Sequence, residues 1–171
     1  MTATAANEFA TAIAACSTIS QEYGLLLAKD IPADRFCERP HATINHPAFV
    51  YGHLALYPNR VGELVGAGPL IELPETYAGL FEAGVECADN TGQHPDKDEL
   101  MRLFTEGYAK AGEAVLAAEP SVFGKENPVE RMRERFPTIG IAVSFLMNNH
   151  LMMHLGQVSS WRRAVGLGSV M

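Results

Sequence analysis

The sequence has few features that would direct the chain to nucleic acid or to a membrane surface. Its basic residues form no cluster longer than the pair Arg162 and Arg163, and the formal net charge is −7 over 171 residues. A phosphate backbone or an anionic membrane attracts proteins through clustered positive charge. We therefore expect no nucleic-acid partner and no membrane partner.

Cysteine is also scarce. Cys16, Cys37 and Cys87 are far apart, and no two of them have the C-x-x-C spacing. An odd number of widely spaced cysteines speaks against a disulfide framework and against a zinc site built of thiolates. This pattern fits a reducing cytoplasm, and we expect Cys16 to be a small buried apolar residue of a helix.

Long apolar runs are missing as well. Every apolar segment is interrupted by a charged or polar residue before it reaches membrane-spanning length, and the N-terminal segment has no early Lys or Arg. Asn7 and Glu8 lie where the apolar core of a secretory signal would be. The sequence therefore predicts a soluble cytoplasmic protein.

Apolar residues make up 47% of the chain, enough to bury one good core but too little for two comfortable domains. We expect a single domain over residues 1–171. The apolar residues recur at helical spacing in four segments, which predicts an all-α fold. Three of the expected helices cover residues 7–28, 98–118 and 138–165. The other, second in chain order, can be capped by Asn45 and ends at Gly66 or Gly68. The core stripe expected on the first helix is Phe9, Ile13, Cys16, Ile19, Tyr23 and Leu26.

The connection between the second and third helices has about thirty residues, more than most connections in compact domains. It is either a functional lid or it carries a short helix, which we place at residues 75–83. Four helices with one long crossover predict a four-helix bundle. Bundles place metal and ligand sites in the core, on side chains from facing helices.

Three histidines are candidates for such a site. His150 and His154 are four residues apart, so at about 100° per residue both face the apolar side of the fourth helix, with Met153 and Trp161. The same count turns His53 toward the core from the second helix. Three converging neutral imidazoles leave a bound ion with an open coordination position, as in catalytic sites. The alternative is that each buried histidine only forms a hydrogen bond with a neighbour.

Other residues near these positions have two interpretations each. His46 is about two turns from His53, roughly 10 Å of rise, so we interpret it as a helix-end residue and not as a fourth ligand. Gln157 either supports a ligand ring or packs, and Gly52 and Gly156 either admit a close approach to the site or serve helix packing. Tyr57 and Trp161 either line the pocket or fill the core. Three arginines either bind a carboxylate of a thiol cofactor or are solvated surface residues: Arg60, Arg162 and Arg163.

The stretches "NHPAFVYGHLALYPNRVGELVG" and "NNHLMMHLGQVSSWRRAVGL" together resemble the DinB-like family. Members of that family have a G-H-L-A stretch on the second helix and an H-x-x-x-H-x-G-Q stretch on the fourth, and the match is to these signature blocks with compatible spacing. The resemblance implies a four-helix bundle that holds a divalent ion, zinc or nickel, on three histidines. The matching positions here are His53, His150 and His154. We expect close to one ion per chain.

The family includes S-transferases and isomerases that use a low-molecular-weight thiol such as bacillithiol, mycothiol or glutathione, beside many members without a known activity. The resemblance therefore implies a metal-dependent thiol S-transferase or isomerase acting on a small molecule, with substrate and thiol undefined. The alternative is a non-catalytic metal-binding stress or binding protein of the same fold. The sequence alone identifies no catalytic residue.

The fourth helix also has a surplus apolar face. Opposite the histidines the helical wheel places Ile141, Phe145, Asn148, Met152, Leu155 and Ser159. The crossover, the N-terminal segment or a second subunit must cover such a face. Because DinB-like proteins often pair as homodimers, we expect a twofold dimer, with cover by residues 69–97 as the alternative.

Overall fold

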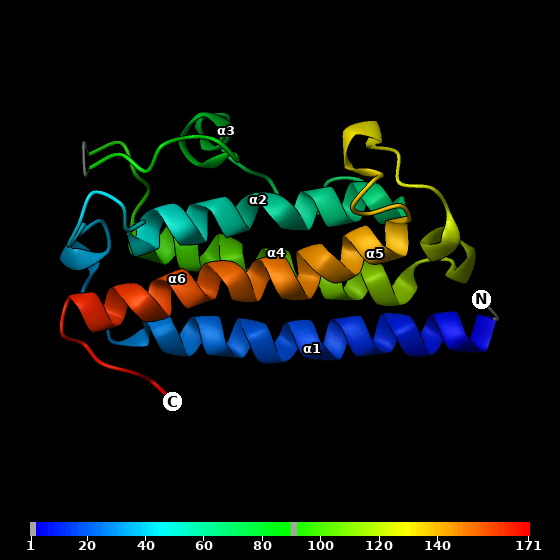
Figure 1. Cartoon of the computed structure of the whole chain (residues 1–171), viewed down its shortest axis with the longest axis horizontal. Helices are drawn as coiled ribbons and strands as arrows, with labels where there is room; N and C mark the ends of the chain where they lie inside the picture. Colours follow the sequence, from blue (N-terminus) through cyan, green and yellow to red (C-terminus); the bar gives the residue numbers. More distant parts are fainter. Residues whose placement is uncertain (1–2, 90–91) are drawn as a thin grey trace.

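A computed structural model describes residues 3–89 and 92–171, and its regular secondary structure is helical (Figure 1). They contain no strand, only an isolated bridge between Glu126 and Thr138. The all-α prediction is confirmed. None of the described helices has the length and apolar character needed to cross a membrane.

Long helices make up most of the structure. They are α1 (Ala3–Lys29), α2 (Pro47–Val65), α4 (Lys97–Ala117), and the pair α5 (Ile139–Ser144) and α6 (Leu151–Ala164), joined by the π-helical segment η4 (Phe145–His150). The short helices are η1 (Ala33–Arg35), α3 (Thr76–Phe81), η2 (Pro120–Gly124) and η3 (Glu130–Met132). The four helical segments expected from the sequence are all present, with ends shifted by a few residues.

Capping explains where α2 begins and ends and where α4 begins. His46, rather than the expected Asn45, caps α2, because its Nδ1 atom accepts a hydrogen bond from the Phe49 amide at 3.0 Å. Gly66 ends α2 with a φ of 86°, a left-handed conformation that favours glycine. Asp96 caps α4 by accepting from the Glu99 amide at 2.8 Å.

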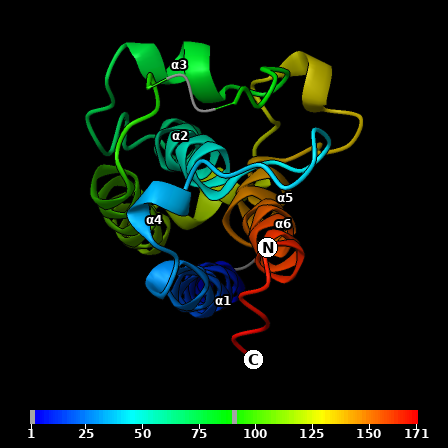
Figure 2. The ribbon, with the colours of Figure 1, turned by 90° about the vertical axis from the view of Figure 1, so that its left-hand side faces the viewer.

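The long helices lie side by side along one axis. Helix α2 packs against α4, α4 against α1, and α6 against both α1 and α2 (Figure 2). Their facing sides form a continuous apolar core that includes Leu54, Phe104 and Leu155. Side chains of α2 and α6 therefore meet inside the structure.

Helix α1 faces this core with small residues. Ala10, Ser17 and Gly24 are buried, and a Cβ atom on Gly24 would lie 2.9 Å from Cζ of Phe104. The expected stripe is therefore wrong at Cys16, which is exposed, and at Ile19, which is 67% exposed. Leu26 is also exposed. Small residues allow a close approach of helices, and an apolar count alone could not detect this choice of face.

The π-helical segment changes the face of the last helix. A π turn holds one residue more than an α turn, so it rotates the following residues by about 100° relative to an uninterrupted α-helix. Val143 is buried before this segment, Met147 within it, and Leu151 and Leu155 after it. Leu155 was predicted on the outer face, and this is wrong.

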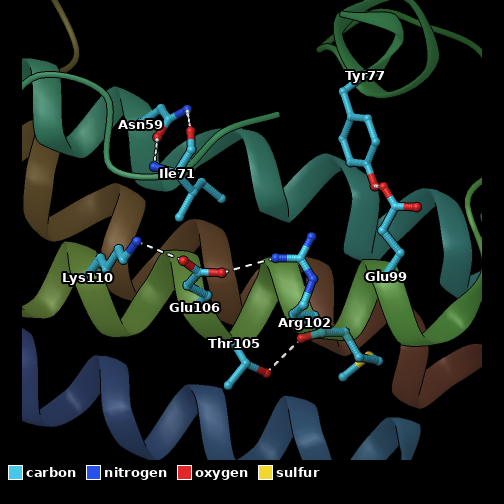
Figure 3. Close-up of polar contacts among 9 residues, drawn as sticks. Asn59, Ile71, Tyr77, Glu99, Arg102, Thr105, Glu106 and Lys110 are labelled. Carbon is cyan, nitrogen blue, oxygen red and sulfur yellow. Dashed lines mark hydrogen bonds and ion pairs between the residues drawn. The ribbon is translucent and has the colours of Figure 1, made fainter. Parts of the chain in front are cut away.

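The predicted crossover joins α2 to α4 and carries a short helix, α3, inside the expected range 75–83. Residues 90 and 91 of this connection lie outside the described residues. Asn59 of α2 holds its first part: the side-chain oxygen accepts from the Ile71 amide at 2.9 Å, and the side-chain nitrogen donates to the Ile71 carbonyl (Figure 3). The Tyr77 hydroxyl of α3 donates to Glu99 of α4 at 3.1 Å. The crossover is thus fastened along α2 and α4.

The outer face of the last helix is only partly apolar. Ile141 and Met152 are exposed, whereas Phe145 packs on Phe136 with ring centroids 4.6 Å apart. The rotation also exposes Met153, at 53%, which was expected beside the histidines. The homodimer stays a prediction, and the molar mass by light scattering decides it.

Candidate metal centre

His53 is held in a fixed orientation at the centre of α2. Its Nδ1 atom lies 2.7 Å from the carbonyl oxygen of Phe81, at the end of α3. A carbonyl only accepts, so Nδ1 carries the proton and Nε2 has the free lone pair. Metal-binding histidines are commonly oriented in this way, by a hydrogen bond from the other ring nitrogen.

His150 and His154 meet His53 from the last helix. The His53 and His150 Nε2 atoms are 3.3 Å apart, and the His154 ring centroid is 4.5 Å from those of both His53 and His150. One nitrogen from each ring lies within 4.8 Å of the others. The structure thus brings together all three histidines that the sequence singled out, and we call them the histidine cluster.

The spacing of the nitrogens fits an ion. Two nitrogens bound tetrahedrally to zinc, each about 2.0–2.1 Å from it, are about 3.3 Å from each other. The Nδ1 atom of His150 is buried and has no hydrogen-bond partner in the described part of the chain. An ion held at Nε2 would leave this atom unpaired as well, so the observation that fits an ion is the 3.3 Å separation of the His53 and His150 Nε2 atoms. These residues can hold a metal ion.

Burial keeps the cluster neutral, which is the form that binds metal. Burial, together with the charges of His154 and His53, lowers the pKa of His150 to about 3. Burial also lowers the pKa of His154 to about 4, aided by the charge of His53 and opposed by a hydrogen bond with Gln157. The pKa of His53 is lowered by burial and raised by its bond to Phe81.

Two further side chains support the cluster. The ring of Tyr57 lies 4.0 Å from that of His150 and 4.9 Å from that of His53, centroid to centroid, so it forms one wall of the site. Gln157 hydrogen bonds to His154 and accepts a hydrogen bond from Asn45 at 3.1 Å. The supporting interpretation of Gln157 is therefore the one the structure favours.

Other candidates lie elsewhere. His46 is a helix cap, as expected for a helix-end residue. Arg162 is 1% exposed and pairs with Asp30, so it joins α6 to α1 and is not a surface residue. The Trp161 indole donates to the Glu38 carbonyl, which places it at the end of the core and not in the site wall. Arg60 is exposed and lies near Glu63 and Glu82.

The Phe81 carbonyl was missed, because a main-chain acceptor leaves no signal in the residue types. Gly52 is the one indirect sign of this contact in the sequence. A Cβ atom at Gly52 would lie 2.5 Å from Cε1 of Phe81, so glycine lets α3 lie flat on α2. Within the described ranges, and apart from its own helix, no atom lies within 4 Å of a Cβ atom at Gly156, so the close approach seen at Gly52 is absent there.

We expect Gly52→Ala to lower the free energy of unfolding by about 1–3 kcal/mol, because the new methyl group must displace the Phe81 ring. The displacement also disturbs the acceptor of His53, so metal affinity should fall. Urea unfolding measures the first effect. Gly156→Ala is the matched control and should be neutral or stabilising, since alanine favours a helix by up to about 1 kcal/mol. Equal effects of the two substitutions would contradict the packing of Phe81 on Gly52.

The metal-free protein should lose stability as the pH falls below neutral. In the unfolded chain these histidines titrate near 6.5, but in the folded chain the pKa values of His150 and His154 are about 3 and 4. Between these limits the unfolded state binds more protons, so the free energy of unfolding decreases as the pH falls through 6.5 toward 4. Urea unfolding at neutral pH and at about pH 5 measures the slope. His150→Asn should reduce it, and an unchanged slope would contradict the burial of a neutral His150.

Comparison with protein-family models and with curated proteins finds no match for this chain.

Proposed function

We propose that the chain is a DinB-like protein with a four-helix bundle, and that its histidine cluster binds one divalent ion, zinc or nickel. The observation that carries the proposal is the convergence of His53, His150 and His154, with ligand atoms within 4.8 Å of one another. The G-H-L-A and H-x-x-x-H-x-G-Q stretches contain these three residues, so motif and geometry support the same set. Imidazole nitrogens suit both metals.

We further propose that the site serves a metal-dependent S-transferase or isomerase that uses a low-molecular-weight thiol. A bound divalent ion would lower the pKa of such a thiol and so supply the thiolate at neutral pH. Three protein ligands, not four, leave room for an exogenous group. His154 is only partly buried, which gives the cluster a side open to small molecules.

The chain orients the imidazole rings of the cluster and keeps them uncharged. The Phe81 carbonyl orients His53, a hydrogen bond with Gln157 acts on His154, and burial favours the neutral form of all three imidazoles. In an S-transfer the thiol loses its proton to solvent, and its sulfur bonds to an electrophilic carbon as the leaving group departs with the bonding electrons. Tyr57 is placed to contact a small molecule bound at the cluster, because its ring lies against both His53 and His150.

The test is turnover of a chromogenic electrophile by zinc- or nickel-loaded protein with bacillithiol, mycothiol and glutathione in turn. We expect one of these thiols to support turnover that disappears on chelation and in a variant with alanine at His53, His150 and His154. The variant must first show an unchanged helical circular dichroism spectrum. Metal-bound protein without turnover with any thiol would reject the enzyme and favour the alternative, a non-catalytic metal-binding protein.

A further inference from the structure

A second group of potential ligands lies at the end of the molecule where α2 begins. Cys37 follows η1, His46 caps α2, and His94 lies in the crossover just before α4. One ligand atom from each of the three lies within 4.8 Å of the others. We propose that Cys37, His46 and His94 form a second metal site, for a transition-metal ion such as zinc, which fastens the crossover to the start of α2. This inference does not depend on the proposed function of the histidine cluster.

The chemistry of the three side chains suits a transition metal. A thiolate and two imidazoles can bind zinc or copper, whereas calcium and magnesium prefer oxygen. The Nδ1 atom of His94 is buried and unpaired among the described residues, although the side chain as a whole is partly exposed. Its ring lies edge-on to His46, with centroids 4.8 Å apart. An unpaired buried nitrogen beside a thiol and a second imidazole is accounted for by an ion that it binds.

His46 already has partners, and these define how it can bind. Its Nδ1 atom accepts from the Phe49 amide, so in the neutral ring Nε2 carries the proton and donates to the Ala88 carbonyl at 3.0 Å. Metal binding at Nδ1 uses the same tautomer and keeps the bond to Ala88, at the cost of the cap. Loss of a helix cap destabilises the start of the helix. We therefore expect this site to bind zinc more weakly than the histidine cluster does.

The second site is connected to the first through Phe81. The His94 and Phe81 rings have centroids 6.0 Å apart, and the Phe81 carbonyl accepts the hydrogen bond from His53. Holding His94 against the start of α2 therefore restrains the segment that orients His53. The role that follows for the second ion is to restrain the segment that orients His53.

Cobalt(II) distinguishes the two sites, because only a thiolate ligand produces a sulfur-to-cobalt charge-transfer band in the near ultraviolet. The histidine cluster has no thiolate and cannot produce it. Titration of the metal-free full chain with cobalt should give this band, and zinc should displace it. The band should be lost in Cys37→Ser and in His94→Ala, each checked for folding by circular dichroism. It should persist in His150→Ala.

Cys16→Ser is the matched control, because Cys16 is exposed on α1 and belongs to neither group. It should leave the band unchanged. No band in the wild-type protein with excess cobalt would overturn the proposal, as would a band that survives Cys37→Ser. So would a band that depends on Cys16 or on Cys87 but not on Cys37.

Discussion

Replacing His150 with alanine should weaken zinc binding at the histidine cluster by more than about 100-fold. Loss of an outer hydrogen bond to a metal ligand already costs about 10–100-fold in affinity, and here a ligand itself is removed. His150 is the ring whose Nε2 atom lies 3.3 Å from that of His53. Competition with a chromophoric chelator measures the affinity. The measurement belongs in a Cys37→Ala background, so that zinc at the second site does not contribute.

His41→Ala is the control for this experiment. His41 is exposed in the loop before α2, where its Nδ1 atom hydrogen bonds with Thr43. Its removal should leave the affinity unchanged. Equal affinities of the His150→Ala variant and its parent would show that zinc binds elsewhere.

Zinc at about 100 times its dissociation constant should raise the free energy of unfolding by about 2.7 kcal/mol, because only the folded chain brings the three histidines together. For a domain of this size that gain corresponds to an increase of about 5–10 °C in Tm. Differential scanning calorimetry of the Cys37→Ala protein, with and without zinc, measures it. His53→Ala should abolish the increase. A wild-type-like increase in that variant would contradict ligation by His53.

Much of the fold could be predicted from the sequence, because periodicity and caps are local signals. Pro47 at the start of α2, Gly66 at its end and Thr138 before the last helix all mark boundaries that the structure has. The face of a helix was predicted less well. The helical wheel placed Leu155 outward because it assumes an uninterrupted α-helix. The π-helical segment adds a residue to one turn, and no residue type in the sequence indicates that insertion.

The candidate site was likewise predicted where local helical patterns determine it and missed where they do not. His53 and the pair His150 and His154 could be found because they lie on core-facing sides of helices that pack against each other. His154 follows the π turn by four residues and still faces the cluster, since the rotation moves it to the edge of the buried side and not out of it. The contact of Phe81 with His53 joins residues 28 apart through a main-chain atom, which sequence patterns do not encode.

The second group was not predicted for a related reason. Cys37 and His94 lie in irregular segments without periodicity, and only the folded crossover brings them to His46. The three cysteines were judged by their spacing to one another. A mixed site with one thiolate needs no such spacing.

The central claim is that His53, His150 and His154 together bind one divalent ion. The most direct test is the metal content of untagged Cys37→Ala protein, measured by mass spectrometry after zinc loading and removal of free metal. We predict close to one zinc per chain in that protein, and close to none when all three histidines are alanine and the chain remains helical. Full occupancy in the triple-alanine variant would contradict the claim.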